Sequence, residues 1–190
     1  SDPVPISRQR EGLEVINSQV KNLTAFLDSY HRLTHLPEPE YKTVSVPALF
    51  TKLERLLQAE PRSERVVYCD GKADRSTGKE LQVYGDANLL TLALINLIRN
   101  ALQAVEGQED GIVRVDTCAG ATGHLLIIIT DNGPGIPPER LSAIFTPFFS
   151  TKSGGSGIGL PISQRIMQLH GGQLSVSSIP NVRTEFRMEF

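Results

Sequence analysis

Two asparagines stand one helical turn apart in the stretch Asn-Leu-Ile-Arg-Asn-Ala-Leu-Gln-Ala, which spans residues 96–104. At 3.6 residues per turn, Asn96, Asn100 and Ala104 share one face of a helix. Asparagine is a modest helix former and usually lies at the surface, yet this stretch and the residues before it are rich in leucine, isoleucine and alanine. The pattern indicates a polar strip on an otherwise buried helix. The alternative at this point is a pair of capped or mutually bonded amides at an element boundary.

The segments on either side of this helix predict a mixed α and β domain. We expect Asp86 to cap the long helix, further helices over residues 47–58 and 160–170, and strands over residues 43–46, 65–70, 81–84, 112–118, 124–130, 173–178 and 184–190. The runs at 65–70 and 81–84 flank a loop rich in Gly, Asp and Ser and predict a hairpin. Helices and antiparallel strands that alternate irregularly are typical of an α+β fold, here a two-layer α/β sandwich with a mixed, mostly antiparallel sheet.

The chain divides near Pro37 and Pro39 into residues 1–37 and residues 38–190. Before the prolines, apolar residues recur at spacings that alternate between three and four: Leu13, Ile16, Val20, Leu23, Leu27 and Tyr30. Such a seam predicts a long heptad helix that packs on another helix, either one absent from this chain or one from a second copy. A helix that lies on the globular domain is the alternative.

Charge, cysteine content and the length of apolar runs indicate the partners and the compartment to expect. The net charge of −2 at pH 7 gives no reason to expect nucleic acid as a partner. Cys69 and Cys118 both lie in apolar runs and are expected to be reduced, which fits a reducing compartment. No apolar run approaches ~18 residues, so we expect a cytoplasmic location, while a membrane anchor upstream of residue 1 in a longer protein stays open.

A second motif, Asp-Asn-Gly-Pro-Gly-Ile, spans residues 131–136 and follows a run of three isoleucines. Asp131 stands at the end of the expected strand, where a carboxylate that faces a pocket can accept a hydrogen bond from an exocyclic amine such as that of adenine. Gly133 and Gly135 allow a backbone to approach a flat ligand closely. Taken alone, the same residues are also compatible with an ordinary Pro-Gly turn.

A third motif, Gly-Gly-Ser-Gly-Ile-Gly-Leu, spans residues 154–160 and leads directly into a helix. Glycines before a helix N-terminus free backbone N–H groups to bind an anion such as a di- or triphosphate. No Gly-Lys-Ser/Thr is present, which excludes a Walker A loop, and a flexible linker is the alternative. Between the two glycine motifs, Phe145, Phe148 and Phe149 are expected to anchor a lid on the domain, and Lys152 could reach a phosphate.

The order of these motifs resembles the catalytic, ATP-binding domain of sensor histidine kinases, in the wider family that includes gyrase, Hsp90 and MutL. Residues 96–104 are similar to the N box, 131–136 to the G1 box, 145–149 to the F box and 155–160 to the G2 box, and 183–186 to a last, weaker box. The wording of the N and F boxes looks closest to the nitrogen-regulation type. The resemblance covers about residues 44–190 and implies a Bergerat-type ATP-binding fold, while the heptad helix is similar to the second helix of a dimerisation hairpin.

The resemblance also implies roles for individual residues. Asn100 would ligate Mg²⁺ that bridges the ATP phosphates, and Asp131 would accept from the adenine amino group while Gly133 and Gly135 give the base room. Thr184 would support Asp131 or the adenine through its hydroxyl. The nucleotide-binding residues implied in this way are Asn100, Ala104, Asp131, Gly133, Gly135, Ile136, Lys152, Gly155, Ser156, Gly157, Ile158, Gly159, Leu160 and Thr184.

Asn96 separates two branches of this family. Gyrase-, Hsp90- and MutL-like members carry a glutamate there that activates water, and an amide has no basic site near neutral pH. The resemblance with Asn96 and Asn100 as catalytic residues therefore implies transfer of the γ-phosphoryl group to a histidine rather than hydrolysis of ATP. Gln103 replaces a lysine that many sensor kinases have, so phosphate neutralisation would fall more to Lys152 or Arg99.

The phosphoacceptor histidine is expected to lie outside this chain. The family carries it on the first hairpin helix before an acidic residue, a setting that none of His31, His35, His124 and His170 has. We therefore expect a fragment that begins after that helix, that pairs as a homodimer through the heptad helix in the full-length protein and that relays phosphate to the receiver domain of a response regulator. The alternative is a nucleotide-binding, non-catalytic signalling module that acts by contact.

Overall fold

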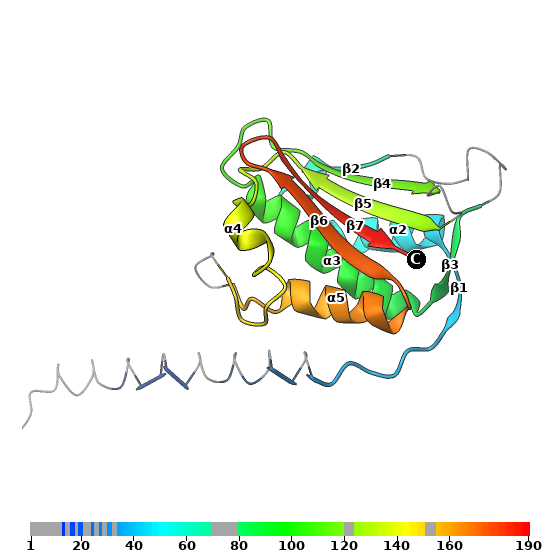
Figure 1. Ribbon diagram of the computed structural model, residues 1–190, viewed down its shortest axis with the longest axis horizontal. Helices are drawn as coiled ribbons and strands as arrows, with labels where there is room; N and C mark the ends of the chain where they lie inside the picture. Colours follow the sequence, from blue (N-terminus) through cyan, green and yellow to red (C-terminus); the bar gives the residue numbers. More distant parts are fainter. Residues whose placement is uncertain are drawn as a thin grey trace, which may run out of the picture.

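A sheet of five strands forms one layer of the protein, and helices cover one of its faces (Figure 1). In spatial order the strands are β2 (Val66–Tyr68), β4 (Val113–Ala119), β5 (Leu125–Asp131), β7 (Arg183–Glu189) and β6 (Gln173–Ile179). Only the β2–β4 pair is parallel, so the sheet is mixed and mostly antiparallel, which confirms the α+β prediction. This computed structural model describes residues 34–69, 80–119, 124–150 and 155–190, together with positions 13, 16, 17, 19, 20, 24, 27, 30 and 31.

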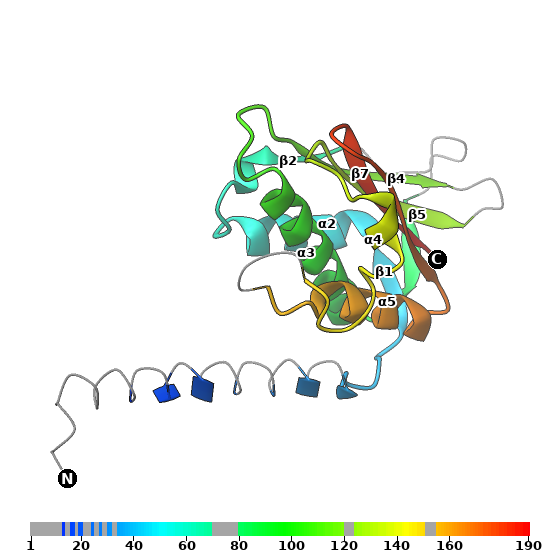
Figure 2. The same ribbon diagram turned by 60° about the vertical axis from the view of Figure 1, so that its left-hand side comes forward.

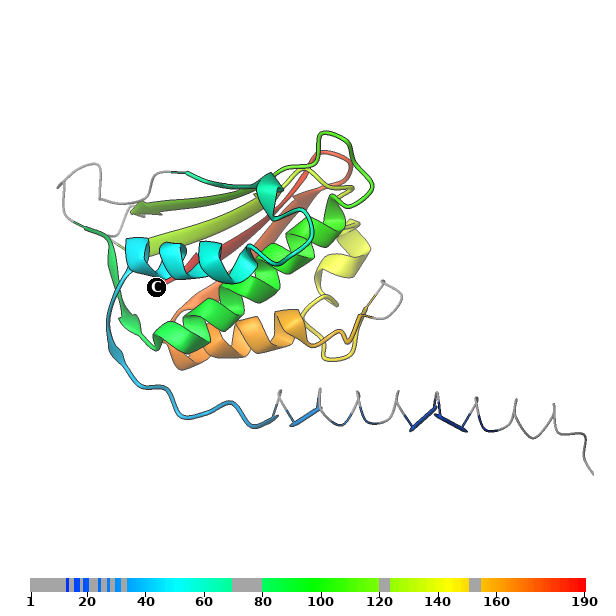
Figure 3. The same ribbon diagram turned by 180° about the vertical axis from the view of Figure 1, so that it is seen from behind.

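The helical layer contains α2 (Val46–Leu57), α3 (Ala87–Ala104) and α5 (Gly159–Leu169), and α3 lies between the other two (Figures 1 and 3). A single turn of 3₁₀ helix, η1 (Ser63–Arg65), precedes β2, and the short helix α4 (Pro138–Leu141) follows β5. The view from behind shows α2, α3 and α5 on the same side of the sheet (Figure 3). The second layer of the predicted sandwich is therefore formed by these three helices.

The core lies between α3 and the inward face of the sheet. Leu94, Leu97 and Ile98 on α3 are fully buried, and Ile127 and Ile129 on β5 face them. Burial alternates along β5 because successive side chains of a strand point to opposite faces. Asp131, the last residue of β5, stands two positions after Ile129. The same alternation therefore brings its side chain to the inward face of the sheet, beside the helices.

The predicted hairpin of residues 65–70 and 81–84 is wrong. β2 pairs in parallel with β4, whereas β3 (Gln82–Gly85) pairs antiparallel with β1 (Lys42–Ser45) in a separate two-stranded sheet. A two-residue turn makes consecutive strands pair with each other, but the segment between these two runs is much longer than such a turn. Partners distant in the sequence therefore determine the pairing of both strands. Residues 70–79 lie outside the described part of the chain.

The described positions of the N-terminal segment between 13 and 31 are helical, as the heptad pattern predicted (Figure 2). Five seam residues are between 52% and 66% exposed: Leu13, Ile16, Val20, Leu27 and Tyr30. In the structure these five side chains do not pack on the globular domain. Leu23, the remaining seam residue, lies outside the described positions.

The segment that follows this helix is fastened to the domain at the start of α3. The backbone N–H of Glu40 donates to Asp86 Oδ2 at 2.8 Å, and the Tyr41 hydroxyl donates to the Leu169 carbonyl at the end of α5. His170 accepts from the backbone N–H of Asp86 at 2.9 Å. One contact region thus joins the linker, the beginning of α3 and the end of α5. None of the helices in the described residues is long and apolar enough to cross a membrane.

Candidate functional site

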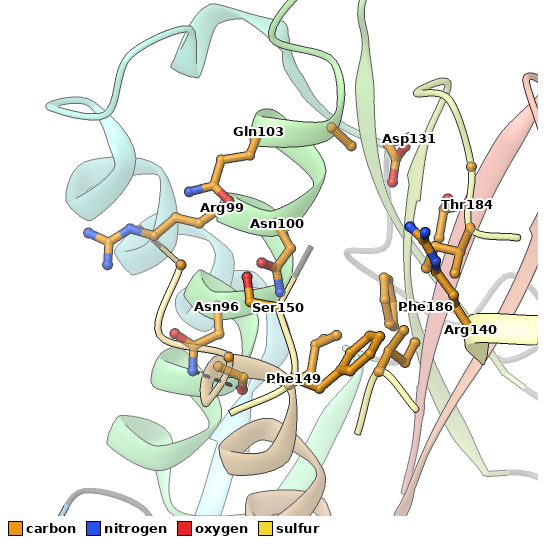
Figure 4. Close-up of a pocket in the computed structure, with 18 of the residues that line it drawn as sticks. Asn96, Arg99, Asn100, Gln103, Asp131, Arg140, Phe149, Ser150, Thr184 and Phe186 are labelled. Carbon is orange, nitrogen blue, oxygen red and sulfur yellow. Dashed lines mark hydrogen bonds between the residues drawn. The ribbon is translucent and has the colours of Figure 1, made fainter. Parts of the chain in front are cut away.

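A pocket of about 480 Å³ opens at one end of the helical layer, between α3, the beginning of α5, the segment after β5 and strand β7 (Figure 4). Most of the predicted site residues line this pocket: Asn96, Asn100, Ala104, Asp131, Gly135, Ile136, Gly155, Ser156, Gly157, Gly159, Leu160 and Thr184. Gly133 and Ile158 are buried close to the pocket but do not line it. Lys152 lies outside the described residues. Motifs separated by up to ninety residues in the sequence therefore meet at one place.

The α3 side of the pocket is the polar strip expected from the sequence. Asp86 begins the helix, because its side chain accepts from the backbone N–H groups of the second and third residues of α3 at 2.7 and 3.0 Å. From that start, the helical period brings Asn96, Asn100 and Ala104 to the pocket face. Asn96 Nδ2 donates to the Gly159 carbonyl at 3.4 Å, which ties α3 to the first residue of α5.

The opposite side of the pocket is the end of β5. Asp131 is only 3% exposed, and its Oδ1 accepts from the Gly133 backbone N–H at 2.9 Å. The next residue, Asn132, holds the chain in place: it accepts from the Ile112 N–H at 2.8 Å and donates to the Asp110 carbonyl at 3.0 Å. Figure 4 shows the Asp131 side chain across the pocket from Asn100. A buried carboxylate fixed in this way is suited to accept a hydrogen bond from a ligand.

Two glycines after Asp131 are required by neighbouring protein atoms. A Cβ at Gly133 would lie 2.7 Å from Asp131 Oδ1 and 2.9 Å from the Ala104 Cβ. Gly135 has φ +75°, and a Cβ there would lie 2.8 Å from the Cα of Pro180 in the turn between β6 and β7. Close protein packing therefore requires glycine at both positions, and the expectation that they also make room for a base stays a prediction.

The glycine segment before α5 is joined to the phenylalanine segment. Gly157 has φ +66°, and a Cβ there would lie 2.6 Å from the Phe148 carbonyl carbon. The Phe148 N–H donates to the Gly157 carbonyl at 3.0 Å. Ile158, which precedes α5, makes no side-chain capping bond. The first turn of α5 therefore keeps backbone N–H groups that no side-chain cap satisfies, beside the pocket, as an anion-binding helix N-terminus requires.

Two arginines among the described residues line the pocket, and they differ in their surroundings. Arg99 Nε donates to Glu60 Oε1 at 2.9 Å, so its guanidinium is engaged on the far side of α3. Arg140 on α4 lies across the pocket from Asn100, and its guanidinium makes no hydrogen bond or ion pair with the described residues (Figure 4). Sequence reasoning missed Arg140, because a single arginine in a short helix carries no spacing signal.

None of the four histidines lines the pocket. His170 joins the ends of two helices, since its Nδ1 bonds the Ile166 carbonyl at 2.7 Å and its Nε2 accepts from the Asp86 N–H. His124 Nδ1 bonds the Phe190 carbonyl at 2.8 Å. The rings of His31 and His35 stack on each other with centroids 4.4 Å apart. His170 thus has a structural role, because it joins the end of α5 to the start of α3.

The fold and the pocket together define an ATP-binding domain, and comparison with known proteins gives its family. Residues 85–190 match the family of histidine kinase-, DNA gyrase B- and HSP90-like ATPases, and the chain belongs to that family. Within the family it is an ATP-binding catalytic domain of the sensor histidine kinase type, as the motif order predicted.

The relatives cover different parts of the chain. The sensor histidine kinase ZraS of Salmonella typhimurium is 42% identical over 98 residues, which are 52% of this chain and 21% of that protein. The sensory histidine kinase/phosphatase NtrB of Vibrio alginolyticus is 33% identical over 184 residues, 92% of this chain and 50% of that protein. The solved catalytic domain of the histidine kinase ThkA is 27% identical with a TM-score of 0.65, over 80% of this chain and 95% of that one. The chain therefore spans half or less of these two curated relatives.

Proposed function

We propose that this domain binds Mg·ATP in the pocket and that the full-length protein transfers the γ-phosphoryl group to a histidine outside residues 1–190. The observation that carries the proposal is the pairing of an amide strip on α3 with a buried carboxylate at the end of β5. The base would bind at Asp131 and Thr184, and the phosphates between Asn100 and the first turn of α5. The phosphoryl group would then pass to the receiver domain of a response regulator.

The chemistry beside the phosphates favours transfer over hydrolysis. Asn96 cannot act as a base, and its Nδ2 is directed to the Gly159 carbonyl. Among the described residues that line the pocket, Asp131 is the sole carboxylate, and it stands at the other side with Oδ1 bonded to the Gly133 N–H. No described group is therefore placed to activate a water molecule at the γ-phosphate, and positioning of an external imidazole nucleophile is what the pocket can supply.

The residues present fit Mg²⁺ held mainly by the nucleotide. The described residues contain no group of three or more His, Cys, Asp or Glu that could hold a metal ion by themselves. Asn100 offers an amide oxygen to the pocket, and Mg²⁺ typically takes few protein ligands together with phosphate oxygens and water. When bound, Mg²⁺ supplies charge neutralisation at the phosphates. Asn100 would hold it, and Asn96 would keep the α5 N-terminus in place.

The exposed heptad seam supports pairing of two copies through the N-terminal helix. Five apolar side chains in heptad register are exposed in the single chain, which is an arrangement that a coiled-coil partner would bury. In the full-length protein, the N-terminal helix would then be part of a dimerisation hairpin that packs against the hairpin of the second copy. Both the homodimer and the receiver-domain partner are parts of the proposal.

Titration calorimetry with Mg·ATP tests the metal assignment. Asn100→Ala should lower the affinity for Mg·ATP while leaving the affinity for ATP in excess EDTA nearly unchanged. Asn88→Ala is the matched control, since Asn88 is an exposed asparagine on the same helix that contacts Lys52 and does not line the pocket. An unchanged Mg·ATP affinity in Asn100→Ala would contradict the assignment.

Incubation of the full-length protein with γ-labelled ATP distinguishes the kinase from the alternative. Transfer to a histidine should give protein-bound phosphate that is labile in acid and stable in base. A protein that binds ATP and yet acquires no such phosphate would favour the non-catalytic module that signals by contact.

A further inference from the structure

Ser178, near the end of β6, is the centre of a hydrogen-bond cluster beside the base side of the pocket. Its Oγ lies 2.8 Å from the backbone nitrogen of Ile136, 3.1 Å from Thr184 Oγ1 and 3.2 Å from the Arg183 carbonyl oxygen. Ser178 and Thr184 are direct partners across the β6–β7 pair. The serine therefore joins the segment after Asp131 to the strand that carries Thr184.

Only one assignment of hydrogens satisfies the three contacts together. A serine hydroxyl has one hydrogen to donate and two lone pairs that accept. The Arg183 carbonyl can only accept, so it takes the serine hydrogen, and the Ile136 N–H can only donate, so it occupies one lone pair. The remaining contact requires Ser178 to accept, which makes the Thr184 hydroxyl the donor.

The polarity of Thr184 determines what its hydroxyl can present to the pocket. With its hydrogen directed to Ser178, the hydroxyl offers only lone pairs in other directions. Thr184 is the direct strand partner of Asp131, both residues are 3% exposed, and both line the pocket (Figure 4). Two acceptors next to each other favour a ligand group that donates, such as an amino group, and disfavour a carbonyl oxygen in the same place.

The backbone around Ser178 holds this arrangement in position. The Asn181 N–H donates to the Pro134 carbonyl at 2.8 Å, and the space that a side chain at Gly135 would need is filled by Pro180. The turn from β6 to β7 is thus packed directly on the segment that follows Asp131. The contacts of Ser178 belong to a packed junction rather than to a free surface rotamer.

We infer that Ser178 is a positioning residue that sets the polarity of the Thr184 hydroxyl and thereby makes the pocket select a purine with an amino group, rather than a keto group, opposite Asp131. The inference rests on the proposed binding of ATP. It concerns selectivity between bases, and it assigns a role to a residue that lies outside the pocket lining.

The test compares the affinities of the 190-residue chain for ATP and for inosine triphosphate, which carries a keto group where adenine carries the amino group. In Ser178→Ala, the ATP affinity should fall about five-fold, the effect of one neutral hydrogen bond, while the affinity for inosine triphosphate stays within about two-fold. The preference for ATP should therefore contract about five-fold. Ser178→Thr keeps the hydroxyl and should restore the preference, and Ser177→Ala, an exposed serine one position away, should leave it unchanged.

The preference ratio separates positioning from general damage. Equal losses for the two nucleotides in Ser178→Ala would leave the ratio unchanged and would overturn the inference, as would a contracted ratio in Ser178→Thr. If Ser178→Ala fails to fold, Thr184→Val is measured instead, because it removes the hydroxyl whose polarity is in question. A ratio of ATP affinity to inosine triphosphate affinity equal to that of the wild type would overturn the inference here too. Failure of the wild-type chain to bind either nucleotide would instead refute the proposed function.

Discussion

Asn96 and Asp131 face the same pocket from opposite sides, and their side chains divide its chemistry. The amide of Asn96 is directed to the backbone at the start of α5, so it organises the anion side without supplying a base. The carboxylate of Asp131 is buried and accepts from the Gly133 N–H, and under the proposed function it would also accept from the amino group of the base. Under the proposed function, a pocket built in this way would hold the nucleotide and leave its γ-phosphoryl group for an acceptor brought from outside.

Arg140 should contribute to nucleotide affinity through its charge. Among the described residues that line the pocket, Arg99 is paired with Glu60, whereas Arg140 has no ion pair within the described residues. Arg140→Ala should weaken ATP binding about two- to five-fold, the range for a solvent-accessible charge interaction, and should leave adenosine binding unchanged. Calorimetry at low and high salt measures this, since added salt should reduce the difference. Arg165→Ala, an exposed arginine on α5, is the control, and equal losses for ATP and adenosine would contradict the charge role.

Helix α3 positions most of the amide strip, and its first turn depends on Asp86. Burial alone raises the pKa of this carboxyl, but the backbone N–H groups of Glu40, Leu89 and Asn88 all donate to it and hold its pKa below the usual range. A pKa that is lower in the folded state stabilises the fold at pH values above the unfolded-state pKa of about 3.9. This contribution is lost as the pH falls through the folded-state pKa.

Asp86→Ala should lower the free energy of unfolding at pH 7 by about 1–2 kcal/mol, because α3 loses its N-cap and the linker loses its anchor. Urea denaturation measured from pH 7 down to pH 2 should show the difference from wild type shrinking as the wild-type carboxyl becomes protonated. The exposed Asp110 provides the control variant Asp110→Ala. A difference that stays constant over this pH range would show that the charge of Asp86 is not the cause.

Strand β2 carries a buried hydroxyl that costs stability. The Tyr68 hydroxyl has no hydrogen-bond partner among the described residues, and burial together with nearby Glu54 raises the pKa of Tyr68 to about 12. The ring itself packs against Phe50 of α2. Tyr68→Phe keeps this packing and removes the unsatisfied group, so the free energy of unfolding should stay equal or rise by about 1 kcal/mol. Thermal and urea denaturation measure it, and a loss of stability would mean that the hydroxyl has a bonded partner.

The sequence predicted correctly those features of the fold that depend on the periodicity of a single helix or strand. The helical period around Asn96 and the alternation that ends at Asp131 each follow from one element, and both side chains reach the pocket. The pairing of β2 with β4 and the close packing of Gly135 on Pro180 depend on contacts between distant segments. Arg140 and Ser178 were missed for the same reason, since neither stands in a spacing that indicates a site.

The N-terminal helix and the domain present two very different surfaces in one chain. The domain buries its apolar residues between the sheet and three helices, whereas the helix leaves five seam residues exposed. An exposed apolar stripe in heptad register is unstable alone in water and gains free energy by packing on a partner. If two copies pair as proposed, the linker anchored at Asp86 would connect the domain to the paired helices.

A single charge in the seam should separate dimer formation from nucleotide binding. Val20→Glu would bury a charge in each half of the paired helices, so the dissociation constant of the dimer should rise at least about ten-fold. Gln19→Glu adds the same charge one position away from the seam and should change it little. Sedimentation equilibrium measures both, and ATP affinity should be equal in the two variants because none of the seam residues that the structure describes lines the pocket. Equal dimerisation of Val20→Glu and wild type would show that the copies do not pair through this face.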